Sequence, residues 1–167
     1  MTPKIIVVAH NLRSCHNVGS LLRTCDGIGV ENVFLTGYTP YPAHKDEARL
    51  PHISRKIDKQ IEKTALGAQK TQKWQKIEDV TDVFGILKKN GYKVCALEQS
   101  ARSTSLNDFK TPDKVALIIG SETTGLDISV LENMEFILEI PMLGKKESFN
   151  VIQATAMALY KFRFAPY

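Results

Sequence analysis

The chain has 167 residues and a formal net charge of +4 at pH 7, with 43% hydrophobic and 24% charged residues. This composition is typical of one globular domain with a sizeable core, and it excludes a disordered chain. The three cysteines have no CxxC spacing, which predicts free thiols in a cytosolic protein. No apolar run reaches the length of a membrane span or of a signal-peptide core. We therefore expect a cytoplasmic protein, outside the membrane, folded as a single domain over residues 1–167.

Short apolar runs predict six β-strands, with helical patterns between most of them. The strands are expected at Lys4–Ala9, Asn32–Thr36, Lys73–Ile77, Tyr92–Leu97, Lys114–Ile119 and Phe136–Ile140. Runs such as Val115–Ile119 are continuously apolar, which is typical of strands covered by helices on both faces. The alternation of strands and helices favours an α/β fold with a mainly parallel, doubly wound sheet. Ligands of such sheets bind beyond the carboxyl ends of the strands.

Apolar residues at spacings of three and four predict the helices between these strands. The stripes consist of Val18, Leu21, Leu22, Cys25 and Ile28; of Ile53, Ile57 and Ile61; and of Val80, Val83, Phe84 and Leu87. A last helix is expected to begin near Ser148, a good N-cap, and to run through Leu159 to Phe162. The segment Tyr38–Arg49, which holds two prolines, is the one long loop that we predict.

Positive charge is concentrated in residues 45–76, where nine Lys and Arg residues stand against four Asp and Glu residues, a local net charge of +5. A basic patch of this kind suits RNA, because phosphate contacts supply affinity that does not depend on sequence. The alternative is an ordinary solvated helix face. The candidates for RNA contacts are Arg49, Arg55, Lys56, Lys59 and Lys63.

The first motif, residues 11–23, follows the first strand. Asn17 near a helix start is typical of a cap, and His16 beside it favours a structural role. Arg23 stands off the apolar stripe of its own helix, near the carboxyl edge of the sheet. A surface arginine is one interpretation, but a guanidinium there could bind an RNA phosphate through two hydrogen bonds.

The second and third motifs each follow a buried strand. In the second, Gly120 allows close approach of a ligand to the backbone and Gly125 allows a positive-φ turn, with Glu122 between them. In the third, a proline-bearing loop leads from Ile140 to Ser148, the predicted cap. Two neighbouring loops of this kind predict a walled pocket for a small cofactor.

Several well-known signatures are missing from the sequence. No GxGxxG follows the first strand, which argues against a nicotinamide enzyme of the Rossmann type, and there is no P-loop GxxxxGK[ST]. There is also no GxSxG elbow. Cysteine and histidine spacings do not fit a zinc site, so we predict no metal.

Together, and in this order, the three motifs resemble those of the SpoU (TrmH) family of SPOUT RNA methyltransferases. The motifs are Asn17-x-Gly19-x-x-x-Arg23, Gly120-x-Glu122-x-x-Gly125, and Ile140-Pro141-Met142 followed by Ser148-Phe149-Asn150-Val151. The resemblance runs from His10 to about Leu159. It implies an α/β fold with a deep C-terminal trefoil knot, and a homodimer with the site at the subunit interface.

The resemblance also implies an activity and roles for residues. The activity is S-adenosylmethionine-dependent methyl transfer to a ribose 2′-hydroxyl of tRNA or rRNA, without a metal. The cofactor would be held largely by backbone around Leu97, Gly120, Ile140, Met142 and Phe149. Arg23 would activate the 2′-hydroxyl, and the residues that shape the site would be Asn17, Glu122, Ser148 and Asn150. Two residues depart from the usual Ser-Leu-Asn-Val-Ser pattern, namely Phe149 and Ile152.

Two other functional classes stay open at this point. One is a non-catalytic RNA-binding or ribosome-assembly factor on the same fold, against which the intact motif residues argue. The other is a nucleotide-dependent Rossmann enzyme, disfavoured by the missing glycine fingerprint. We also expect no separate RNA-binding extension of the kind found in some family members, and therefore expect RNA recognition by residues 38–76 and the partner subunit.

Overall fold

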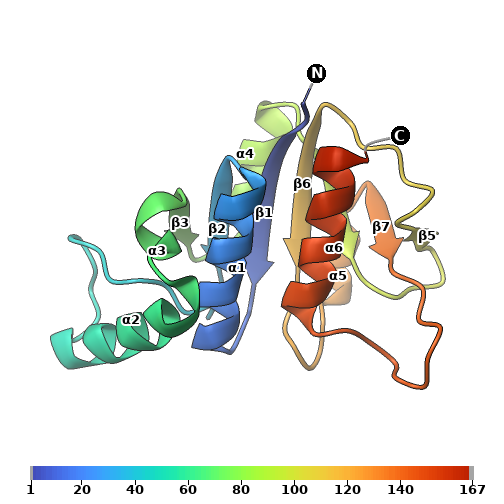
Figure 1. The fold of residues 1–167 in the computed structure, drawn as a ribbon. Coiled ribbons are helices and arrows are strands. Elements are labelled where there is room, and N and C mark those ends of the chain that lie inside the picture. Colours follow the sequence, from blue (N-terminus) through green and yellow to red (C-terminus); the bar gives the residue numbers. More distant parts are fainter. Residues whose placement is uncertain (1, 166–167) are drawn as a thin grey trace.

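The computed structural model describes residues 2–165, which form a seven-stranded sheet with helices on both faces (Figure 1). The strand order is β3-β2-β1-β6-β4-β7-β5, and the paired strands are all parallel. The strands are β1 Lys4–His10, β2 Asn32–Thr36, β3 Trp74–Ile77, β4 Lys93–Leu97, β5 Thr104–Ser105, β6 Lys114–Ile119 and β7 Phe136–Glu139. The helices are α1 Cys15–Ile28, α2 Pro51–Ala65, α3 Ala68–Thr71, α4 Val80–Lys89, α5 Ile128–Leu131 and α6 Val151–Phe164.

The sheet separates two apolar clusters, one against α1, α2 and α6 and the other against α4 and α5 (Figure 1). Alternate residues of β1 belong to different clusters: Ile5 and Val7 pack in the first, and Ile6 and Val8 in the second. This period of two follows from the pleat of a strand. A strand buried on both faces therefore reads as a continuous apolar run, which is why the sequence predicted it correctly.

The sequence-based prediction of a parallel α/β sheet is confirmed, but the number of strands was wrong. The seventh strand, β5, has only two residues and pairs with β7, with Thr104 opposite Leu138. Two residues cannot display a periodic pattern, so this strand had no signal in the sequence.

Two helix starts differ from simple capping expectations. The last helix begins at Val151 rather than near Ser148, because the Asn150 side chain accepts a hydrogen bond from the Ile152 N–H at 2.9 Å. Helix α1 is capped by Ser14, whose hydroxyl accepts from the Asn17 N–H at 3.2 Å, so the Asn17 side chain is free for another contact. In α6 the cap is thus the motif residue Asn150 in place of Ser148, whereas in α1 the cap is Ser14 and the motif residue Asn17 is left outside that role.

Helix α2 lies against α1 on one face of the sheet. The Thr64 hydroxyl donates a hydrogen bond to the His16 carbonyl oxygen at 2.8 Å, which ties the two helices together. Of the predicted apolar stripe on α2, Ile61 is buried but Ile53 is 41% exposed. The other faces of α2 are therefore available to solvent or to a ligand. Within residues 2–165 no helix has the length and apolar content that crossing a bilayer requires.

Candidate active site

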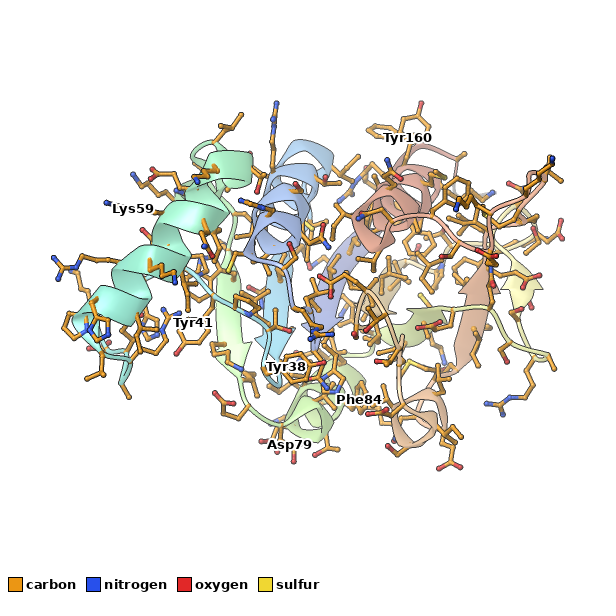
Figure 2. The ribbon with its side chains drawn as sticks, turned by 90° about the horizontal axis from the view of Figure 1, so that it is seen from below. Tyr38, Tyr41, Lys59, Asp79, Phe84 and Tyr160 are labelled. Carbon is orange, nitrogen blue, oxygen red and sulfur yellow. The ribbon has the colours of Figure 1, made fainter. Side chains whose placement is uncertain are left out.

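A pocket of about 350 Å³ opens at the carboxyl edge of the sheet, between the segments that follow β4, β6 and β7. Figure 2 looks onto this end of the molecule. The volume is within the range of small-molecule sites, and the position is where α/β sheets bind ligands. Its lining residues with apolar side chains include Leu97, Leu138, Ile140, Met142 and Phe149.

Tight backbone packing shapes the turn between β6 and the pocket. Ser121 and Gly125 exchange two backbone hydrogen bonds, at 3.1 and 3.0 Å, and Gly125 has a φ of 66°. A Cβ added to Gly120 would lie 2.7 Å from the Leu126 nitrogen, closer than side-chain carbons approach backbone atoms. The turn therefore requires glycine at both positions, which accounts for the two glycines of the second motif.

Glu122, at the tip of this turn, connects the second motif to the first. Its carboxylate accepts hydrogen bonds from the Arg13 N–H at 2.9 Å, the Ser14 N–H at 3.0 Å and the Asn17 side-chain amide at 2.9 Å. Burial alone would raise the pKa of Glu122, but these hydrogen bonds outweigh it and the pKa lies below its ordinary value. The acid thus holds the start of α1 against the pocket.

Glu98, directly after β4, also lines the pocket and was not singled out in the sequence. One carboxylate oxygen accepts the Leu126 N–H at 2.9 Å. The carboxyl group packs so closely on Gly125 that a Cβ there would lie 3.0 Å from its Cδ atom. Burial raises the pKa of Glu98 above its ordinary value, despite backbone hydrogen bonds that favour the ionised form. An acid directly after a buried apolar strand was the one signal that could have identified it.

The charged residues that line the pocket are all glutamates. Three glutamates line it, at positions 98, 122 and 139, and its lining residues include no lysine, arginine or histidine. Glu139 accepts a hydrogen bond from the Ser103 hydroxyl at 2.6 Å. A phosphate-bearing ligand would meet repulsion here, whereas a neutral or cationic ligand would not.

The structure brings most of the predicted site residues together. All five residues predicted to hold a cofactor line the pocket, and so do Glu122 and Ser148. Asn17 is joined to the pocket through Glu122. Asn150 instead caps α6, and Arg23 is exposed on α1 and is not among the lining residues.

Residues 141–150 form the outer wall of the pocket and are largely exposed, with Leu143 99% accessible. The Gln99 side-chain amide donates a hydrogen bond to the Glu147 carbonyl oxygen at 2.7 Å. This contact ties the outer wall to the end of β4. Two residues adjacent in sequence thus contact different segments of the pocket, because Glu98 binds the turn after β6 and Gln99 binds the outer wall.

Four of the five basic candidates lie exposed on α2, namely Arg55, Lys56, Lys59 and Lys63. Lys59 projects outward from α2 in Figure 2, away from the sheet.

Arg49 differs from these four, because its side chain is only 16% exposed. It pairs with Glu47, donates to the Tyr41 carbonyl oxygen at 3.0 Å, and lies 3.6 Å from the centre of the Tyr41 ring. Arg49 thus stabilises the loop before α2, and counting charges in the sequence could not have separated it from the others.

Helix α6 carries an exposed apolar stripe. Met157, Tyr160 and Phe164 are 40%, 60% and 60% accessible, and the rings of Tyr160 and Phe164 lie 5.0 Å apart. Tyr160 points away from the sheet in Figure 2. Arg163, on the same helix, donates to the Ile28 carbonyl oxygen at 3.0 Å, which places α6 beside α1.

Among residues 2–165, no group of three or more histidine, cysteine or acidic side chains is arranged to hold a metal ion.

Residues 4–160 match the model of the SpoU rRNA Methylase family. A putative TrmH family tRNA/rRNA methyltransferase from Staphylococcus haemolyticus is 27% identical over 156 residues, which are 93% of this chain and 57% of that protein. The 23S rRNA (guanosine-2'-O-)-methyltransferase RlmB from Neisseria meningitidis is 27% identical over 161 residues, or 96% of this chain and 58% of that protein. The chain thus spans less than two thirds of the length of these curated relatives.

The fold is also found among solved structures. The AdoMet-bound rRNA methyltransferase from Sinorhizobium meliloti superposes with a TM-score of 0.81 at 20% sequence identity. The superposition covers 100% of this chain and 58% of that protein. At this identity the similarity establishes a shared α/β architecture.

Proposed function

The chain belongs to the SpoU rRNA methylase family, and from this membership we propose that it transfers a methyl group from S-adenosylmethionine to a ribose 2′-hydroxyl of tRNA or rRNA. The observation that carries the proposal is the pocket at the carboxyl edge, where residues of the second and third motifs meet and Glu122 binds the first. The similarity to a guanosine-2'-O-methyltransferase supports the ribose as the acceptor.

The residues of the pocket fit S-adenosylmethionine. The apolar side chains, among them Leu97, Ile140 and Phe149, suit an adenine ring, and the glutamates complement the sulfonium and ammonium charges. NAD or ATP would bring phosphates into a pocket that has no basic lining residue. When bound, S-adenosylmethionine supplies a methyl group on a sulfonium; its transfer to the 2′-oxygen leaves a neutral thioether and releases the hydroxyl proton.

The chain's own residues contribute mainly by positioning. Glu122 fixes the start of α1, and with it Asn17, against the pocket. Arg23 is the residue that we assign to the RNA phosphate and the 2′-hydroxyl. A guanidinium keeps its proton at neutral pH, so electrostatic orientation of the hydroxyl is the more accessible role for Arg23 than proton abstraction.

Arg23 lies outside the pocket of its own chain, which supports a site completed by a second copy. The apolar stripe of Met157, Tyr160 and Phe164 on α6 is the surface that we assign to this homodimer. Exposed apolar stripes on monomeric proteins are unusual, and α6 lies beside the helix that carries Arg23. A dimer across α6 would bring Arg23 of one copy toward the pocket of the other.

We assign RNA binding to the exposed basic face of α2, with Arg55, Lys56, Lys59 and Lys63 as phosphate contacts. Arg49 is not one of these contacts, because its guanidinium is engaged with Glu47 and Tyr41. Helix α2 is tied to α1 through Thr64, so an RNA bound there is held near the first motif.

We also propose the deep trefoil knot and a cytoplasmic location. The order of the sheet, in which β7 lies between β4 and β5 while α6 returns to α1, is compatible with a threaded C-terminal segment. The three free cysteines suit a reducing compartment. Residues 1–167 would act as one methyltransferase domain.

Calorimetry followed by a transfer assay tests the proposed function. We expect S-adenosylmethionine to bind and NAD not to bind, and total tRNA or rRNA from a deletion strain to accept a radiolabelled methyl group. The modified nucleotide should resist alkaline cleavage at its 3′ side, because the 2′-oxygen is blocked. Cofactor binding without transfer to any RNA would favour the non-catalytic RNA-binding factor. Failure to bind S-adenosylmethionine would contradict the proposal.

A further inference from the structure

Glu98 lines the pocket but belongs to none of the three motifs. It follows the last residue of β4 and lines the pocket together with residues of the outer wall, Met142, Ser148 and Phe149. Its carboxylate is half-buried and accepts the Leu126 N–H at 2.9 Å. The close packing on Gly125 fixes the carboxyl group in place, so its charge is presented to the pocket from a defined position.

The three pocket glutamates differ in what neutralises them. Glu122 accepts three hydrogen bonds from the start of α1, and Glu139 accepts the Ser103 hydroxyl. Glu98 has backbone N–H partners, and within residues 2–165 no lysine or arginine lies close enough to pair with it. Its negative charge is therefore less compensated than that of Glu122, which accepts three hydrogen bonds from the start of α1.

An uncompensated carboxylate in a half-buried site costs free energy unless a ligand offsets its charge. The two ligands that this pocket must distinguish in the proposed reaction differ in charge. The methyl donor carries a sulfonium cation, whereas the demethylated product is a thioether with no charge at sulfur. A carboxylate in the pocket stabilises the first and gives the second no such gain.

Resting on the proposed function, we propose that Glu98 is a specificity-determining residue that makes the pocket prefer the cationic methyl donor over its neutral product. The preference is useful at each turnover, because the by-product is otherwise nearly the same shape as the donor and competes for the same cavity. Loss of the methyl group and the charge weakens binding at the moment when the product must leave.

Glu98→Gln is the variant that isolates the charge. Glutamine has nearly the same shape and keeps a carbonyl oxygen that can accept the Leu126 N–H. Isothermal titration calorimetry would give the Kd of wild type and variant for S-adenosylmethionine, S-adenosylhomocysteine and sinefungin, a cationic analogue without a transferable methyl group. We expect donor and sinefungin binding to weaken about tenfold, and binding of S-adenosylhomocysteine to change less than about twofold.

Two further variants serve as controls. Glu132→Gln removes the same charge from an exposed position at the end of α5, outside the pocket, and should leave all three Kd values unchanged. Glu98→Asp keeps the charge and should keep the preference for the donor, even where its shorter side chain weakens binding of every ligand. Thermal melts of each variant report whether the fold is retained.

The outcomes separate this inference from the proposed function. Equal weakening of all three ligands by Glu98→Gln would assign Glu98 to a part common to them, such as the ribose hydroxyls, and would overturn the role in charge selection. Unchanged affinities would overturn it too. If wild type bound neither donor nor product, the proposed function itself would fail. If Glu98→Gln did not fold, loss of donor preference in Glu98→Asp would overturn the inference.

Discussion

Replacing Glu122 with alanine would remove the acceptor that joins the pocket turn to the start of α1. Three donors lose their partner: the backbone N–H groups of Arg13 and Ser14 and the side-chain amide of Asn17. Hydrogen bonds to a charged acceptor each contribute about 1.5–3 kcal/mol when buried. The site is half-exposed and water can replace part of the loss, so we expect a net destabilisation of about 2 kcal/mol.

For a domain of this size, that loss corresponds to a fall in Tm of roughly 4–8 °C. Differential scanning calorimetry at pH 7 measures it directly. Glu122→Gln keeps one acceptor oxygen but turns an amide N–H₂ toward the backbone donors, so it should lose a large part of the same stability. The exposed Glu132→Gln is the matched control and should melt with wild type.

The pH dependence follows from the lowered pKa of Glu122. A carboxyl group whose pKa is lower in the folded state stabilises the fold fully above its ordinary pKa of about 4.5. The contribution is lost as the pH falls through the lowered folded-state pKa. The difference in Tm between wild type and Glu122→Gln should therefore be largest near neutral pH and shrink below about pH 4. Equal melting temperatures at pH 7, or a difference that grows in acid, would refute this account of Glu122.

Four further changes test the proposed site. Arg23→Ala should reduce methyl transfer at least about 100-fold while the Kd for S-adenosylmethionine stays within about twofold, and an unaltered rate would remove Arg23 from the mechanism. Lys59→Glu together with Lys63→Glu should weaken RNA binding and lower the slope of log K against log salt by about one for each lost contact. Unchanged RNA affinity would mean that this face of α2 is an ordinary solvated face. Gly120→Ala places a Cβ against the backbone of the same turn and should abolish cofactor binding in calorimetry, which normal binding would contradict. If the proposed homodimer forms across α6, Tyr160→Arg should convert it to a monomer in analytical ultracentrifugation, and a persistent dimer would place the interface elsewhere.

Much of the fold could be predicted from the sequence because its strands are buried on both faces. Such strands are continuous apolar runs, and those of β1 and β6 appear in the sequence almost to the residue. The helices α1 and α4 were predicted because one face of each is buried and shows as an apolar stripe. In α1 this face includes Val18, Leu21 and Leu22. The predictions that were wrong concern a very short strand and a helix start with two possible caps. β5 is too short to have a period, and Ser148 and Asn150 are both good N-caps, so local preference could not choose between them.

The sequence indicated the candidate residues that lie within the three motifs. It could not indicate residues whose role depends on a contact with a distant part of the chain. The resemblance to the family implied the five residues predicted to hold the cofactor, and all five line the pocket at the carboxyl edge of the sheet. The Glu98 carboxylate is held in the pocket by the Leu126 N–H, which lies 28 positions away in the sequence. Arg49 is not available for an RNA contact, because Glu47 and Tyr41 bind its guanidinium. Neither relation has a spacing that a sequence pattern could display.

Two acids in one pocket thus have opposite environments, and this contrast supports a division of roles. Hydrogen-bond donors from α1 lower the pKa of Glu122, whereas burial raises the pKa of Glu98. Glu122 is satisfied by the protein itself, so its removal should be seen mainly in stability. Glu98 lacks a countercharge within residues 2–165, so its removal should be seen mainly in which ligand binds. With the two variants measured side by side, Glu122→Gln should therefore change the melting temperature more, because the protein supplies three hydrogen-bond donors to Glu122. Glu98→Gln should change the ligand selectivity more, because we propose that the cationic donor offsets the charge of Glu98.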